Sequence, residues 1–218
     1  MRNDIRHSLQ EIATKYKLVL FDTCSICDYT KNTENLSSIQ QKEIESYIQY
    51  KSYTFLRNFI LNGDGNTLFF IPEVISELEK ARKIKFTKNF KGKRRFASFR
   101  NFSNNTKYAF ARNKSFVKII RERGLILRLT EEEQIRYNEL YTKFGYLVNF
   151  KGNNLTGADY PLLIKGVVVS EIRGNTALIS NDTKIFGSWV HLLRSSPLKI
   201  NGNLDFFFRN GFDYFSKK

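Results

Sequence analysis

Leu18-Val-Leu-Phe-Asp22-Thr23 is the stretch that decides the fold of this chain. A short, unbroken apolar run is typical of a buried strand inside a parallel sheet. An aspartate directly after such a strand lies at the sheet edge where open α/β folds bind their ligands. We therefore expect Asp22 to be a functional residue; the alternative is that it caps the helix that follows.

Strand and helix patterns alternate along the rest of the chain. Further strands are predicted at residues 67–71, 125–129, 176–180 and 204–208, and helices at residues 3–15, 39–60, 73–83, 108–121, 131–147, 159–174 and 183–192. This alternation predicts an α/β fold, a three-layer α/β/α sandwich with a central, mainly parallel five-stranded sheet. We expect one domain over residues 1–218, with a basic helical insertion at 80–124 and a C-terminal strand and tail at 195–218.

Length and composition place the chain among soluble globular proteins. It has 218 residues, of which 41% are apolar, enough for a sizeable core. No apolar run approaches the about 20 residues needed to span a bilayer, and the first residues lack the apolar segment of a secretory signal. Two cysteines are too few for a disulfide framework. We expect a cytoplasmic protein with no membrane partner.

The net charge of +15 is concentrated in one segment of the chain. Residues 80–123 hold 16 basic side chains against one acidic side chain, Glu122, and so contain the whole excess. Phenylalanines and a tyrosine alternate with these cations, a combination that suits single-stranded nucleic acid, because bases stack on aromatic rings. The predicted contacts to the nucleic-acid backbone are Lys88, Lys91, Lys93, Arg94, Arg95, Arg100 and Arg112.

Four acidic residues follow strands or begin helices of the predicted sheet. Asp22 and Asp182 come just after strands, Glu77 lies early in the helix after the second strand, and Asp159 begins the helix before residues 176–180. Parallel strands end at the same edge, so these carboxylates are expected to converge. Converging carboxylates repel unless a cation neutralises them, and their hard oxygens favour Mg²⁺ or Mn²⁺. Beside a basic segment, such a cluster indicates metal-assisted phosphodiester hydrolysis.

The same residues resemble the ordered motifs of PIN-domain nucleases. The resemblance rests on Leu18-Val-Leu-Phe-Asp22-Thr23, Ile71-Pro-Glu-Val-Ile-Ser-Glu77-Leu78, Gly157-Ala-Asp159 and Leu178-Ile-Ser-Asn-Asp182. It implies that Asp22, Glu77, Asp159 and Asp182 form a metal-binding acidic tetrad, supported by Thr23, Ser180 and Asn181. It also implies an endoribonuclease that leaves a 5′-phosphate. Single-stranded DNA as a second substrate, an antitoxin or other protein partner, a toxin role and a homodimer stay open.

Three other functions compete with this interpretation. Cys24-Ser-Ile-Cys27 has the spacing of a thioredoxin-like or zinc motif, although no tryptophan precedes it and few further ligands are available. A haloacid dehalogenase-type phosphatase also begins with a strand-end aspartate, but needs a second aspartate at position 24, which is cysteine. The third alternative is a non-catalytic RNA-binding module on a PIN-like fold.

Overall fold

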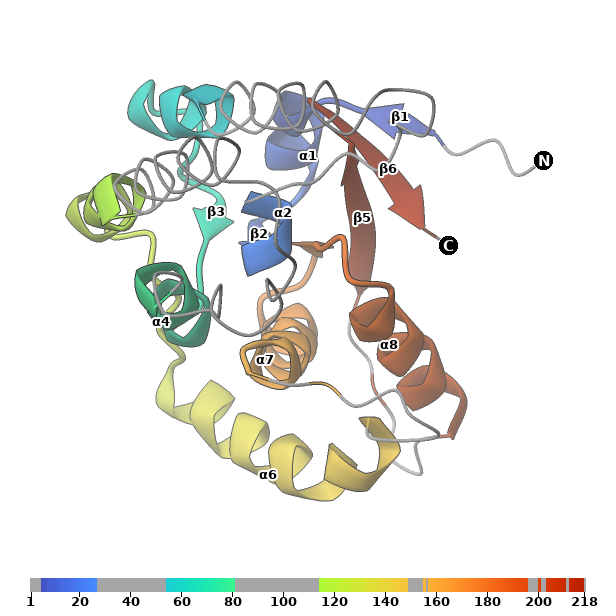
Figure 1. Ribbon diagram of the computed structural model, residues 1–218. Helices are drawn as coiled ribbons and strands as arrows, with labels where there is room; N and C mark the ends of the chain where they lie inside the picture. The colour runs from blue at the N-terminus through green and yellow to red at the C-terminus, as the bar shows by residue number, and fades with distance from the viewer. Residues whose placement is uncertain are drawn as a thin grey trace, which may run out of the picture.

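A six-stranded mixed sheet forms the centre of the molecule (Figure 1). The computed structural model describes residues 5–26, 54–80, 114–148, 155, 157–195, 200, 203–210 and 212–217. The strands are β1 (Arg6–His7), β2 (Leu18–Phe21), β3 (Leu68–Phe69), β4 (Thr176–Ile179), β5 (Leu204–Asn210) and β6 (Asp213–Lys217). They lie side by side in the order β1-β6-β5-β4-β2-β3. Strands β3, β2, β4 and β5 are parallel, whereas β6 and β1 join the β5 edge antiparallel.

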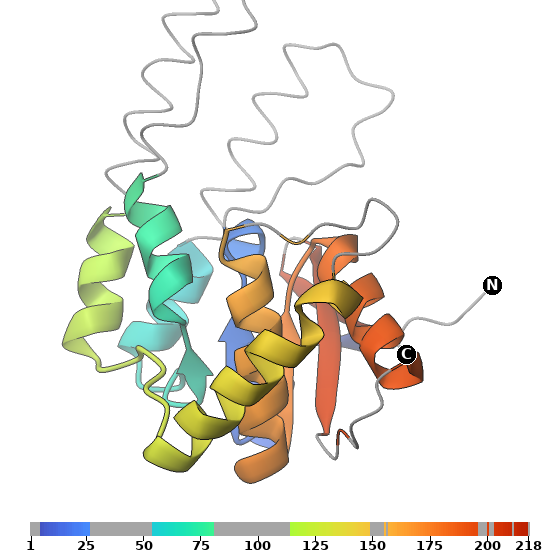
Figure 2. The ribbon, with the colours of Figure 1, turned by 90° about the horizontal axis from the view of Figure 1, so that it is seen from below.

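Helices cover both faces of this sheet. Their bounds are α1 (Leu9–Lys15), α2 (Thr23–Ile26), α4 (Pro72–Lys80), α6 (Glu131–Val148), α7 (Asp159–Ile172) and α8 (Thr183–Ser195), and residues 54–61 and 114–122 are also helical. Figure 1 shows α1 on one side of the sheet and α7 on the other. Figure 2 shows α6 crossing over α7, on which it packs, so α7 lies between α6 and the strands.

The apolar character of α7 explains this layering. All of its residues from Pro161 to Ser170 are buried, and a helix that is apolar on every side must be covered on every side. Gly166 faces the sheet, where an added Cβ would contact the side chains of Leu178 and Leu204 at 3.4 Å. The small residue therefore lets α7 approach β4 and β5 closely, while α6 covers its outer face.

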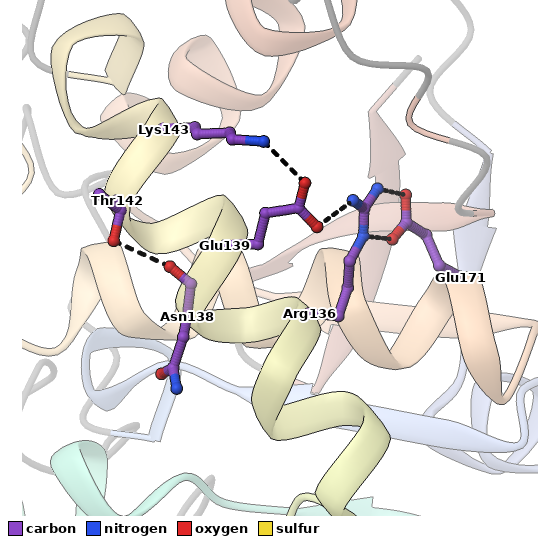
Figure 3. A network of polar contacts seen from close by, with 6 residues as sticks. All are labelled: Arg136, Asn138, Glu139, Thr142, Lys143 and Glu171. Carbon is purple, nitrogen blue, oxygen red and sulfur yellow. Dashed lines mark hydrogen bonds and ion pairs between the residues drawn. The ribbon is translucent and has the colours of Figure 1, made fainter.

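A polar network holds α6 against α7 (Figure 3). The guanidinium of Arg136 donates to both carboxylate oxygens of Glu171, at 2.9 and 3.1 Å, and to Glu139 at 2.8 Å. Lys143 donates to the other oxygen of Glu139 at 2.8 Å. The planar fork of arginine suits two-point binding of a carboxylate, so this pair sets the register of the two helices.

A second ion pair, partly buried, joins α4 to α7. The ammonium of Lys165 on α7 lies 2.8 Å from each carboxylate oxygen of Glu73 on α4. The Lys165 side chain is 10% exposed and that of Glu73 is 36% exposed. Lys165 also lies over the ring of Tyr137, with its nitrogen 5.5 Å from the ring centre. The pair thus fixes α4, which carries Glu77, relative to α7, which begins with Asp159.

The structure confirms an α/β fold and corrects several boundaries. The sheet has six strands, two of them antiparallel, where five mainly parallel strands were expected. Residues 6–7 form β1, outside the predicted helix 3–15, because a capping box at Ser8 begins α1. The predicted strand 125–129 is a single bridge between Phe70 and Ile126. The parts of predicted helices 39–60 and 108–121 that are described, from 54 and from 114, are helical.

The last predicted strand is confirmed as β5, whereas β6 and β1 were not predicted. The expected strand at 204–208 extends to Asn210, and β6 follows it within a few residues as its antiparallel neighbour. β6 in turn pairs with the two residues of β1. No helix in the described ranges is long and apolar enough to cross a membrane.

Replacing Glu73 with glutamine should lower the free energy of unfolding by about 1–3 kcal/mol. Lys165 would stay buried without its ionised partner, while the partial exposure of Glu73 keeps the loss below that of a fully buried pair. Urea unfolding at pH 7 measures the change. Glu79→Gln is the matched control, because Glu79 pairs with Arg121 at 2.8 Å on the surface, where such pairs contribute about 0–1 kcal/mol. Equal losses in the two variants would contradict the prediction.

Candidate active site

The candidate site lies at the carboxyl edge of the parallel strands, where the strand order reverses. After β2 the chain forms β3 on one side, and it later returns to form β4 and β5 on the other side of β2. In open α/β sheets this reversal leaves a crevice outside the strand ends in which ligands bind. Asp22 follows β2 and residues 180–182 follow β4, so both segments border that point.

The Asp22 side chain is buried, with 2% of the residue exposed, and bonds to the end of the neighbouring strand. Its Oδ2 accepts hydrogen bonds from the Ser180 hydroxyl and from the Cys24 thiol, each at 2.7 Å. Its backbone N–H donates to Ile179 at 3.0 Å. The carboxylate therefore ties together the ends of β2 and β4, a role beyond that of a helix cap.

Burial raises the pKa of the Asp22 carboxyl, and the negative charge of Glu77 raises it further. The hydrogen bonds from Cys24, Ser180 and the Thr23 backbone lower the same pKa, but burial is the largest effect. Two carboxylates thus lie within electrostatic reach of each other, one of them removed from water. This arrangement disfavours the ionised form of Asp22 unless a cation is nearby.

Ser180 and Asn181 support this arrangement from the end of β4. The Ser180 hydroxyl donates to Asp22 and accepts from the backbone N–H of Asp182 at 3.0 Å. The Asn181 side-chain oxygen accepts from the backbone N–H of Arg209 at 2.8 Å. Ser180 and Asn181 come directly before Asp182 in the sequence, as expected, and the fold also brings Ser180 into contact with Asp22.

Cys24 also contacts Asp22 and Asn181, and its spacing in the sequence did not predict these contacts. Its sulfur donates to Asp22 and accepts from the backbone N–H of Asn181 at 3.3 Å. Burial raises the pKa of the Cys24 thiol, and the neighbouring Asp22 raises it further. Because a reactive or metal-binding cysteine needs a lowered pKa, these surroundings do not favour a redox role for Cys24. Cys27 lies outside the described residues.

Glu77 connects the end of β2 to the start of α7. Its Oε2 accepts from the Thr23 hydroxyl at 2.7 Å, and its Oε1 accepts from the Ala158 backbone N–H at 2.8 Å. The two neighbouring acids of α4 have other partners, since Glu73 pairs with Lys165 and Glu79 pairs with Arg121. Among the acids of α4, Glu77 is therefore the one that bonds to Thr23 and to Ala158, the residue before Asp159.

Asp159 and Asp182 lie at the same edge, each at the start of a helix. Asp159 is the first residue of α7 and is partly buried. Asp182 precedes α8, and its Oδ1 accepts from the Lys184 backbone N–H at 2.7 Å, a bond typical of a helix start. Within the part of the chain described here, no three His, Cys, Asp or Glu side chains lie close enough together to hold a metal ion. The four predicted acids thus share an edge without forming a closed metal centre.

The donor chemistry of this edge nevertheless fits a hard divalent cation. The four side chains offer carboxylate oxygens, the ligands preferred by Mg²⁺ and Mn²⁺. A cation beside Asp22 would also offset the two effects, burial and the charge of Glu77, that raise its pKa. A metal would therefore stabilise the ionised form of the residue around which the edge is arranged.

Arg209 is a further residue of this edge that the sequence did not indicate. It lies at the end of β5 with 3% of its surface exposed, and its guanidinium donates to the backbone oxygen of Ser25 at 2.7 Å. The Ser25 hydroxyl lies 2.7 Å from the backbone oxygen of Asp22 and 3.0 Å from that of Ile179. The signal that could have indicated Arg209 is its place in a predicted strand rich in phenylalanine, where a charged side chain is unusual.

The predicted nucleic-acid contacts cannot be placed. Lys88, Lys91, Lys93, Arg94, Arg95, Arg100 and Arg112 all lie outside the described residues. Three cations that follow in the described part of the segment have local partners: Lys118 pairs with Glu122, Arg121 pairs with Glu79, and Arg123 donates to the backbone oxygen of Leu61 at 2.9 Å.

Comparison of the chain with protein-family models, with curated proteins and with solved structures finds no match.

Asp22→Asn should stabilise the protein in EDTA, and its advantage over wild type should grow as the pH rises above about 4. A carboxyl whose pKa is raised by folding favours the folded state while protonated, and this contribution is lost as the pH rises through its folded-state pKa. Asparagine stays neutral and can still accept from Ser180. Urea unfolding from pH 4 to pH 8 measures the difference.

The exposed Asp64, in the turn before β3, provides the control for this experiment. Asp64→Asn should follow wild type across the same pH range. A constant difference between wild type and Asp22→Asn would show that the burial of Asp22 does not contribute to the pH dependence.

Proposed function

We propose that this chain is a metal-dependent endoribonuclease with a PIN-like three-layer fold and a basic insertion at residues 80–124. The observation that carries the proposal is the buried Asp22 carboxylate at the reversal of strand order, with Glu77 within electrostatic reach. A carboxyl perturbed by burial and by a specific charge at a ligand-binding edge is a candidate functional group. The motif resemblance supports the same four acids.

In this proposal Asp22 and Glu77, with Asp159 and Asp182, would hold Mg²⁺ or Mn²⁺, which would activate a water and stabilise negative charge at the scissile phosphate. Neighbouring side chains orient these acids. Ser180 and Cys24 donate to the same oxygen of Asp22 and so orient its carboxylate. Thr23 orients Glu77 in the same way. Hydrogen bonds of this kind hold metal ligands in their working orientation.

The charge distribution supports RNA as the substrate. Residues 80–123 contain the whole excess of +15, and that segment interleaves rings with cations. A single-stranded polyanion would satisfy both, through phosphate contacts and through stacking worth about 1–3 kcal/mol per base. A cleavage site made of carboxylates repels phosphate, so a separate basic segment is what such an enzyme needs to retain its substrate.

Wild-type protein should cleave a labelled single-stranded RNA with Mn²⁺ or Mg²⁺, and EDTA should abolish cleavage. Asp22→Asn should lower the rate by at least about 100-fold, because it removes the charge around which the edge is arranged. Cleavage products on a denaturing gel, with and without phosphatase treatment of the 5′ ends, measure the rate and the chemistry. The variant Asp64→Asn should retain the wild-type rate.

Two outcomes would contradict this prediction in different ways. Cleavage that persists in EDTA and in Asp22→Asn would mean that a different site, or a contaminant, is responsible. Tight RNA binding without cleavage in either metal would instead support the non-catalytic RNA-binding module.

Binding of single-stranded RNA by Asp22→Asn should weaken steeply as salt is raised. The logarithm of the binding constant should fall with the logarithm of salt concentration by about 0.7 for each phosphate that the protein binds. Replacing Lys91, Lys93, Arg94 and Arg95 together with alanine should reduce that slope by about 0.7 for each phosphate that is no longer bound. Fluorescence anisotropy between 50 and 300 mM salt, about a sixfold range, measures the slope.

A variant with the same change in net charge outside the segment is the control. Lys15, Lys17, Arg128 and Arg194 are exposed cations on other parts of the chain. Their joint replacement by alanine should leave the slope close to that of the unmodified protein. Equal reductions in the two variants would assign RNA binding to net charge and not to the basic segment.

A further inference from the structure

We propose that Gly157 is a positioning residue for Glu77: the missing side chain at this position lets the Glu77 carboxylate lie between the Thr23 hydroxyl and the Ala158 amide. The catalytic role of Gly157 rests on the proposed function, whereas the contact between Gly157 and Glu77 does not depend on it. It adds a residue that holds the site together without touching substrate.

Glu77 and Gly157 are in direct contact. Gly157 has a positive φ of 59°, in the left-handed region that favours glycine. A Cβ built there would lie closer than 3.0 Å to Oε1 of Glu77 and 3.6 Å from its Cδ. Among the described residues, these are the atoms that such a Cβ would meet within 4 Å. A methyl group at this position would therefore displace the Glu77 carboxylate.

Displacement of that carboxylate would break both of its hydrogen bonds. Oε1, the atom in contact with Gly157, accepts from Ala158, and Oε2 accepts from Thr23, the residue after Asp22. Gly157 thus determines whether the Glu77 carboxylate can lie between Thr23 and Ala158.

Gly124 provides a matched control elsewhere in the chain. It has a φ of 67°, close to that of Gly157, but a Cβ built on it would meet nothing within 4 Å. Alanine at either position imposes the same kind of backbone strain. Alanine at 157 adds the contact with Glu77, so the difference between the two substitutions isolates that contact.

The test is a double-mutant cycle on the melting temperature, measured in EDTA. Gly157→Ala should lower Tm by about 2–4 °C more than Gly124→Ala does. In a Glu77→Ala background, where the carboxylate is absent, the two glycine substitutions should lower Tm equally. Equal losses in the wild-type background, or an excess that persists without Glu77, would overturn the inference.

The second readout is cleavage, which a merely structural role would not affect selectively. Gly157→Ala should reduce kcat by about 10–100-fold with little change in KM for RNA, and should raise the Mn²⁺ concentration needed for half-maximal rate. Thr23→Val, which removes the hydroxyl donor to Glu77, should act in the same direction, and Thr23→Ser, which keeps it, should restore the rate. Gly124→Ala should cleave at the wild-type rate. A wild-type rate in Gly157→Ala would contradict the role.

These measurements separate the two proposals. If wild-type protein does not cleave RNA, the proposed function fails, while the Tm cycle still decides whether Gly157 positions Glu77. If wild type cleaves and the cycle shows no coupling, the inference on Gly157 alone fails. Should Gly157→Ala not fold, Gly157→Asn and Gly124→Asn repeat the comparison, because asparagine tolerates the left-handed region and still carries a Cβ.

Discussion

The burial of the Asp22 carboxylate is the constraint on which the rest of the site depends. An ionised carboxylate loses a large hydration energy when it leaves water, and the fold must offset that loss with hydrogen bonds. Ser180 and Cys24 supply two such bonds to one oxygen. Because one donor lies after β4 and the other in α2, satisfying Asp22 also aligns the end of β2 with its neighbours. The electrostatic requirement of one side chain thereby organises a whole sheet edge.

Hydrogen bonds connect the residue next to Asp22 with helices α4 and α7. Thr23, the next residue, holds Glu77 of α4, and Glu77 holds the amide of Ala158 at the start of α7. The ion pair of Glu73 with Lys165 fixes the same two helices further along. The position of α4 on α7 is therefore set at two points, one at the partly buried ion pair and one at the candidate site. A substitution at either point should therefore affect the geometry at the other, because both connect the same two helices.

Local patterns in the sequence were enough for the elements whose own residues determine them. The apolar runs before Asp22 and Ser180 predicted β2 and β4. The helix predicted from residue 131 begins there as α6, where Thr130 and Glu133 bond to each other's backbone in a capping box. The equivalent box at Ser8 was overlooked, which extended the first predicted helix too far. β6 is a short strand that pairs with β5, and the two residues of β1 form the sheet edge by pairing with β6. The pairing of β1 is a long-range contact that periodicity cannot show. The same limit applies to the site. Asp22 and Glu77 could be chosen from strand ends and motif order, whereas the roles of Cys24 and Gly157 depend on neighbours that only folding brings together.

The energetic cost of the site is itself an argument about function. Burial and a second carboxylate both disfavour ionised Asp22, and hydrogen bonds only partly offset them. A neutral asparagine could still accept from Ser180 and would avoid the cost of burying a charge, so stability alone does not explain why an acid occupies position 22. Arrangements that break a local rule of stability are expected where the strained group has work to do. Negative charge buried at the carboxyl edge of parallel strands would be useful when a cation joins it. In the proposed function, the site would hold a metal while the basic segment at residues 80–123, which carries the excess of positive charge, would bind the polyanion. This division of charge is the physical link between the site and the proposed nuclease.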